Sequence, residues 1–156
     1  MRFQILLIMI VAILTVTGCN ERMNRGTATG FNPQLASDLG ADDYGMRRYV
    51  VAFLYRGENR NRSQEEAEKL QRAHLDNINR LAQNGLLVVA GPFLDQGELR
   101  GIYIFKVETV DEAQKLTETD PAVKAGSLRM ELHPWYGSAA LLKVNEIHNQ
   151  IAKTAI

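Results

Sequence analysis

Hydrophobic positions in the central part of the chain follow a strand-like spacing in four segments. Residues 47–56 (RRYVVAFLYR) are rich in β-branched and aromatic side chains, and residues 86–93 and 99–108 share this composition. Residues 127–135 (SLRMELHPW) alternate between apolar and polar side chains. These patterns predict four strands, the last with one buried face and one solvent-exposed face.

Two segments between the strands have helical spacing. Ser63 and Glu66, and likewise Thr109 and Glu112, have the spacing of a capping box, which begins a helix. Gly85 is suited to end the first helix, because glycine readily adopts the left-handed conformation. Asp120-Pro121 begins one further helical turn, which Gly126 ends. The first helix places these side chains on one face: Ala67, Leu70, His74, Ile78 and Leu81.

The resulting order, β-α-β-β-α-β, predicts a ferredoxin-like α+β fold. A four-stranded antiparallel sheet would carry two helices on one face. The central strands are apolar on both sides, so the other face would be a large exposed apolar patch, which monomers rarely tolerate. We therefore expect a homodimer formed through the sheet faces.

The N-terminal residues indicate export. Residues 1–18 combine Arg2 with an apolar run of signal-peptide length, too short to span a bilayer. Val16-Thr17-Gly18-Cys19 resembles the lipobox of bacterial lipoproteins, which implies lipidation of Cys19, the sole cysteine. The alternatives are an uncleaved anchor or ordinary secretion. Asn20 after the cysteine favours the outer membrane by the same resemblance, so we expect a lipid-anchored, periplasm-facing protein of the cell envelope.

These features divide the chain into four parts. Residues 1–18 are the signal peptide, and residues 19–46 carry the lipidated cysteine and a flexible tether, with a short docked helix around Leu35 as the alternative. Residues 47–136 form the folded domain. Residues 137–156 are a C-terminal extension, which forms either a terminal helix or an arm across the partner subunit.

Composition excludes several function classes. The chain has 18 basic and 18 acidic residues, with no basic stripe of the kind that nucleic acid requires. With Cys19 lipidated, no cysteine remains for a disulfide, a zinc–thiolate site or a thiol nucleophile. His133 and His148 lack the spacing of a metal site. No phosphate-binding glycine loop, serine elbow or dinucleotide motif is present, so we expect neither a metal nor a cofactor.

His74 is the candidate for chemistry. It lies on the inward face of the first helix, where it is either a hydrogen-bonded core residue or a general base that a substrate reaches. Asp120 is explained as a helix N-cap, but a carboxylate has lone pairs enough to accept an imidazole N–H as well. Gly91-Pro92 ends a strand and would also suit the wall of a pocket.

Several of these motifs together resemble the YCII-related proteins. The resemblance rests on His74 in the first helix, the strand ending in Ala-Gly-Pro-Phe at residues 90–93, Asp120-Pro121, and a last strand ending in Pro134-Trp135. It implies a dimeric α+β barrel and a His–Asp active site formed by His74 and Asp120. Its relatives include a chlorohydroquinone dehydrochlorinase and, more distantly, muconolactone isomerase. The N-terminal leader and the residues after Trp135 depart from the usual family unit.

Three functions remain open from the sequence. The first is a cofactor-free enzyme of lyase or isomerase type acting on a small organic molecule, with His74 as general base and Asp120 as its orienting partner. The second is a non-catalytic module that binds a small ligand at the cell envelope. The third is a lipid-anchored dimer that acts through its C-terminal extension. The substrate is not specified by any of these residues.

Overall fold

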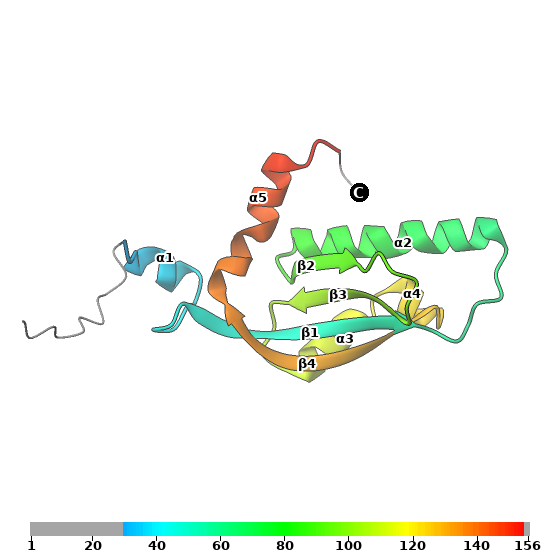
Figure 1. Cartoon of the computed structure of the whole chain (residues 1–156), viewed down its shortest axis with the longest axis horizontal. Coiled ribbons are helices and arrows are strands. Elements are labelled where there is room, and N and C mark those ends of the chain that lie inside the picture. The colour runs from blue at the N-terminus through cyan, green and yellow to red at the C-terminus, as the bar shows by residue number, and fades with distance from the viewer. Residues whose placement is uncertain (1–29, 155–156) are drawn as a thin grey trace, which may run out of the picture. The chain divides into compact units, whose positions relative to one another are not determined.

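The computed structural model describes residues 30–154, and its centre is a four-stranded antiparallel sheet with strand order β2-β3-β1-β4 (Figure 1). Every helix and strand among the described residues lies within the compact unit Asn32–Ile156. The strands are β1 (Met46–Arg56), β2 (Leu87–Pro92), β3 (Leu99–Phe105) and β4 (Leu128–Ser138). The helices are α1 (Pro33–Asp38), α2 (Gln64–Gln83), α3 (Val110–Thr117), α4 (Pro121–Lys124), the 3-10 helix η1 (Ala139–Lys143) and α5 (Val144–Ile151). This arrangement is the ferredoxin-like fold that the sequence predicts.

Capping interactions and a glycine determine where the helices begin and end. Both capping boxes form: the Ser63 side chain accepts from the backbone N–H of Glu66, and Thr109 does the same for Glu112. Each glutamate in turn accepts from the N-cap backbone. Gly85 follows the C-cap of α2 with a φ of +68°, a conformation that costs glycine little.

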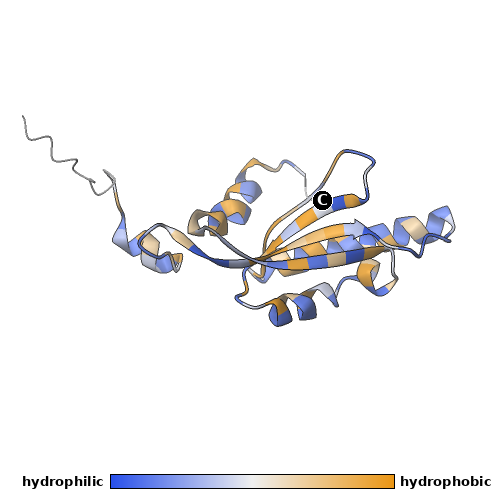
Figure 2. Cartoon of the chain, turned by 60° about the horizontal axis from the view of Figure 1, so that its bottom comes forward, coloured by the Kyte–Doolittle hydropathy of each residue, from blue (hydrophilic) through white to orange (hydrophobic). Residues whose placement is uncertain are grey.

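The main core lies between the sheet and the helices. β1 is central and pairs with β3 on one side and with β4 along its whole length on the other. Figure 2 shows a hydrophobic middle of the sheet and mixed hydropathy along α2, as expected for an amphipathic helix. Burial of these side chains is the dominant stabilising contribution. The fully enclosed members of this core are Val50, Ala52, Leu54, Leu81, Leu87, Tyr103, Phe105 and Ala113.

The C-terminal extension covers one end of the opposite sheet face. Leu141 and Leu142 of η1 pack against a second buried cluster, formed by Tyr49, Val88 and Ile104. The Asn145 side chain of α5 donates a hydrogen bond of 2.8 Å to the backbone carbonyl of Leu87 in the edge strand β2. The last strand continues to Ser138, and residues 139–151 of the extension are helical, which is one of the two forms that the sequence left open.

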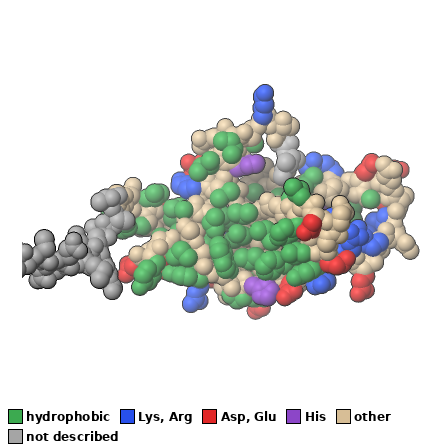
Figure 3. Space-filling model, in the orientation of Figure 1, with side chains coloured by type: hydrophobic (Ala, Val, Ile, Leu, Met, Phe, Trp, Pro, Cys, Tyr) green, Lys and Arg blue, Asp and Glu red, His purple; other side chains and the backbone are tan. Residues whose placement is uncertain are grey.

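The middle of this sheet face, on β1 and β3, is apolar and largely half-buried, and the polar Glu131 and His133 of β4 flank it. Val51 and Phe53 on β1 lie beside Ile104 and Ile102 on β3. Trp135 on β4 is 40% exposed. Figure 3 shows hydrophobic side chains gathered over the middle of this face.

The described residues before β1 include a short helix, unlike the flexible tether that the sequence predicts. Residues 33–38 form α1, with the Asn32 side chain accepting from the backbone N–H of Leu35. Asp42 accepts hydrogen bonds from the backbone N–H groups of Tyr44 and Met46 and from the Tyr136 hydroxyl. The predicted signal peptide, residues 1–18, and the predicted lipidation site Cys19 lie outside the described residues. Among residues 30–154, no helix combines the length and apolarity needed to cross a bilayer.

Candidate functional site

His74 and Asp120 meet between α2 and the start of α4. The Nδ1 atom of His74 lies 2.9 Å from Oδ2 and 3.0 Å from Oδ1 of Asp120. Asp120 is also the N-cap of α4, where its Oδ1 accepts from the backbone N–H of Ala122 at 2.8 Å. The one carboxylate therefore caps its helix and holds the imidazole, as its lone pairs allow.

The contacts of Asp120 define the tautomer of His74. An ionised carboxylate only accepts hydrogen bonds, so the Nδ1 atom of His74 must carry the proton that it shares with Asp120. In the neutral ring this leaves the Nε2 lone pair free to accept. The Asp120 carboxylate is fully buried, whereas the His74 side chain is 11% exposed. The pair therefore consists of an imidazole that can act as a base and a buried carboxylate that orients it.

Tyr103 on β3 is a third member of the site, which the sequence predicts only as part of a strand. Its hydroxyl lies 3.4 Å from Nε2 of His74 and 3.4 Å from Oδ2 of Asp120. Burial raises the pKa of Tyr103 far above its usual value, and the charge of Asp120 and its hydrogen bond add to this. Tyr103 is therefore a neutral hydroxyl over the whole physiological range. No sequence pattern marks it, because strand register alone brings it beside His74.

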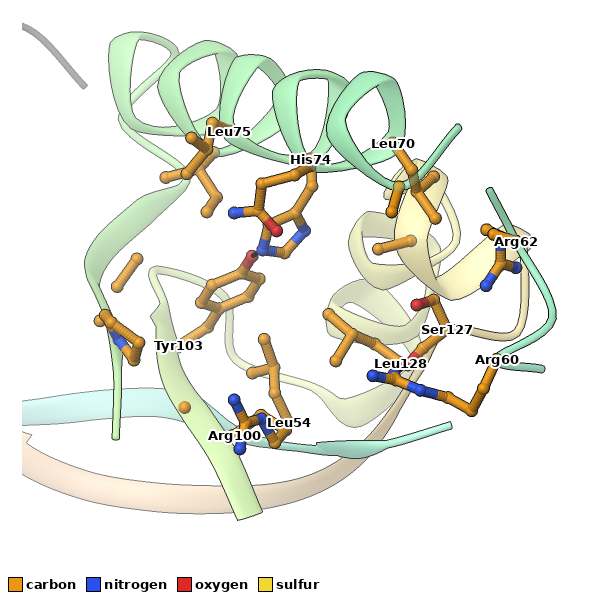
Figure 4. A pocket seen from close by; sticks show the side chains of 18 residues that line it. Leu54, Arg60, Arg62, Leu70, His74, Leu75, Arg100, Tyr103, Ser127 and Leu128 are labelled. Carbon is orange, nitrogen blue, oxygen red and sulfur yellow. Dashed lines mark hydrogen bonds between the residues drawn. The ribbon is translucent and has the colours of Figure 1, made fainter. Parts of the chain in front are cut away.

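A cavity of about 480 Å³ opens beside this group. His74 and Tyr103 point toward each other from α2 and β3 at one side of it (Figure 4). Gly91 and Pro92, the predicted wall, do line the cavity. The apolar part of its lining consists chiefly of Leu54, Leu70, Leu75, Ile78 and Leu128. His74 is thus both hydrogen-bonded and reachable from the cavity, which is the arrangement that general base chemistry requires.

The other histidines lie apart from this site. His133 is on the exposed side of β4, where its Nε2 lies 3.0 Å from Glu131, and His148 is exposed on α5. Within residues 30–154, no group of three His, Cys, Asp or Glu side chains is arranged to hold a metal ion.

Comparison with known proteins gives the family. No curated protein matches the chain. Among solved structures, the chain is similar to 5-chloro-2-hydroxyhydroquinone dehydrochlorinase from Burkholderia phenoliruptrix in complex with 2,5-dihydroxybenzoquinone. The two share 26% identity over 55% of this chain and 92% of the other, with a TM-score of 0.41. The model of the YCII-related domain matches residues 49–136, which include His74, Asp120 and Tyr103. The chain therefore belongs to the YCII-related domain family.

Proposed function

We propose that this protein is a cofactor-free enzyme that catalyses proton transfer, of lyase or isomerase type, on a small organic molecule. The observation that carries the proposal is the buried contact between Asp120 and Nδ1 of His74, in a histidine that also lines a cavity. This contact leaves Nε2 as the base. A cavity of about 480 Å³ has the volume of a small-molecule site.

The proposed reaction uses three groups. Nε2 of His74 takes a proton from the substrate, and the resulting imidazolium is stabilised by the Asp120 carboxylate that holds Nδ1. The neutral Tyr103 hydroxyl turns its proton from Asp120 to the substrate oxygen on which negative charge develops, and donates a hydrogen bond to it. His74 then returns its proton to a different substrate atom, or to water when a leaving group departs. A general base of this kind contributes about 10²–10⁴-fold to the rate.

The test is isomerisation of small cyclic carbon acids in D₂O, followed by NMR. Suitable probes are β,γ-unsaturated cyclohexenones and γ-lactones, with and without a carboxylate substituent. We expect isomerisation and deuterium incorporation with the wild type and with His148→Gln, a matched histidine on exposed α5. The His74→Gln variant should lose this activity by about 10²-fold or more. Equal turnover by His74→Gln would contradict the proposal.

Non-catalytic ligand binding is the second candidate. The apolar lining of the cavity supports it, because such a surface can bind a ligand without help from His74. Under this alternative, probes bind the wild type and His74→Gln with similar affinity, and neither protein incorporates deuterium.

We also propose that Cys19 anchors the protein to the cell envelope, facing the periplasm and favouring the outer membrane. The support is the sequence of residues 16–19 and the apolar run before it. Multiple acyl chains would give stable anchoring where one gives marginal binding. Metabolic labelling with a palmitate analogue, followed by detergent phase partition, should mark the wild type. Labelling of Cys19→Ser would contradict this proposal.

A further inference from the structure

Three arginines line the cavity that contains His74. Arg60 and Arg62 lie in the loop before α2, and Arg100 lies on β3. Figure 4 shows Arg60 and Arg62 at the side of the cavity away from His74 and Tyr103, and Arg100 below Tyr103 on the same strand. The proposed proton transfer uses none of them, so their presence needs a separate explanation.

The cavity lining contains three arginines and, within the described part of the chain, no acidic side chain. Across residues 30–154, no carboxylate lies at ion-pair distance from Arg60, Arg62 or Arg100. The buried Asp120 behind the lining is hydrogen-bonded to His74 and Ala122. The pKa of Glu66 is lowered chiefly by hydrogen bonds from Ser63 and in smaller part by the charge of Arg62.

Backbone carbonyls hold these arginines in place. Arg62 donates from Nη2 to the carbonyl of Ala125 at 2.6 Å, and Arg60 donates from Nη1 to that of Ser127 at 3.3 Å. Arg100 donates from Nη1 to the carbonyl of Gly97 at 3.3 Å. A guanidinium has five N–H donors, so donors remain for a ligand on each side chain. Neutral carbonyls orient these guanidinium groups without forming ion pairs with them.

We propose that the cavity selects a small organic carboxylate with an apolar body, its anionic group bound by Arg60, Arg62 and Arg100. The inference rests on the proposed function, because it names the substrate class of the same cavity. Guanidinium groups match the planar carboxylate with paired hydrogen bonds. The leucines and Ile78 of the lining receive the apolar body, which presents its reacting atom to His74.

The test compares three probes on the folded protein by NMR titration: benzoate, its neutral isostere benzamide, and inorganic phosphate. We expect saturable benzoate binding that weakens with added NaCl and exceeds that of both other probes. Shifts should centre on residues that line the cavity. Absence of saturable benzoate binding, or equal affinity for benzamide or phosphate, would overturn the proposal.

Variants of the cavity arginines test whether these side chains bind the carboxylate. Arg100→Gln should weaken benzoate binding by roughly tenfold or more, and Arg100→Lys by less, because loss of a charge-assisted hydrogen bond has an effect of that order. Arg72→Gln is the matched control, since Arg72 pairs with Asp76 on the exposed side of α2. Unchanged affinity in both Arg60→Gln and Arg100→Gln would overturn the assignment. His74→Gln should retain benzoate binding, so failure of the proposed chemistry and failure of this inference give different results.

Discussion

The Nδ1 atom of His74 lies 2.9 Å from Oδ2 of Asp120, although 46 positions separate the two residues in the chain. The contact joins the middle of α2 to the N-cap of α4. Neither helix would need this contact to form, because Ser63 caps α2 and the Asp120 N-cap bond is made to Ala122. The orientation of the histidine is therefore a property of the tertiary structure.

Replacing Asp120 by Asn should reduce turnover by about 10²–10⁴-fold while the fold remains. Asn caps helices as well as Asp does, but its neutral amide does not stabilise an imidazolium on His74. We expect a loss of stability of about 1–3 kcal/mol, because a buried charge-assisted hydrogen bond is weakened. Steady-state kinetics and thermal unfolding measure both effects. Asp111→Asn, on the exposed first turn of α3, is the control and should change neither.

Tyr103 should stay protonated in the folded protein well above its usual pKa of 10.0. When folding raises the pKa of a group, the native state keeps its full stability at pH values below the unfolded-state pKa. As the pH rises above that pKa, the unfolded state loses the proton first and the native state is progressively destabilised. The wild type should therefore lose more stability than Tyr103→Phe when the pH is raised beyond 10. Thermal unfolding of both proteins across the alkaline range measures the difference. Parallel pH profiles would contradict the burial and charge effects assigned to Tyr103.

Gly57 should not tolerate a side chain. A Cβ at this position would collide with the carbonyl of Gly126 and lie 2.7 Å from the backbone of Ser127. Gly57→Ala should destabilise the fold by about 1–3 kcal/mol, as overpacking does. Because Gly57 and Asn59 hydrogen-bond to this turn, the loop that carries Arg60 should also shift, weakening benzoate binding.

Gly91→Ala is the matched control for this change. A Cβ at Gly91 meets no atom within 4 Å, and its backbone is not in the left-handed region. Its unfolding temperature should stay near that of the wild type. A Gly57→Ala variant as stable as Gly91→Ala would show that the β1 end can move away from the turn at little cost.

The half-buried sheet face should pair with a second copy of the chain. Phe53 lies at its centre, beside Ile102 on β3 and Glu131 on β4. We propose that the wild type is a dimer and that Phe53→Glu, which places a second acid beside Glu131, shifts it to monomer. Sedimentation velocity measures the change, with Lys69→Glu on the exposed side of α2 as control. An unchanged mass for Phe53→Glu would exclude this interface.

Local signals account for what the sequence predicts correctly. Both capping boxes, the glycine end of α2 and the order of strands and helices follow from short-range patterns. The proximity of His74 to Asp120 came from the family resemblance. Spacing alone left His74 either a core residue or a base. It predicted the cap at Asp120, and the lone pairs of the carboxylate allowed a further hydrogen bond from an imidazole without requiring it.

Contacts between segments that are far apart in the sequence could not be predicted from these local patterns. Tyr103 joins the site because β3 pairs with β1 in one particular register, opposite Ala52, which turns its side chain toward α2. The arginine set requires a loop, a strand and the α4–β4 turn to meet. The packing of Leu141 over the second sheet face likewise depends on the position of the extension relative to the sheet.

The protonation of the His74 ring tests the central claim most directly. A long-range ¹H–¹⁵N correlation spectrum at a pH where the ring is neutral identifies the nitrogen that carries the proton. We predict a proton on Nδ1, shared with Asp120, and a bare Nε2, with a mixture of tautomers in Asp120→Asn. A wild-type ring protonated on Nε2, with Nδ1 bare, would contradict the assignment of His74 as the base.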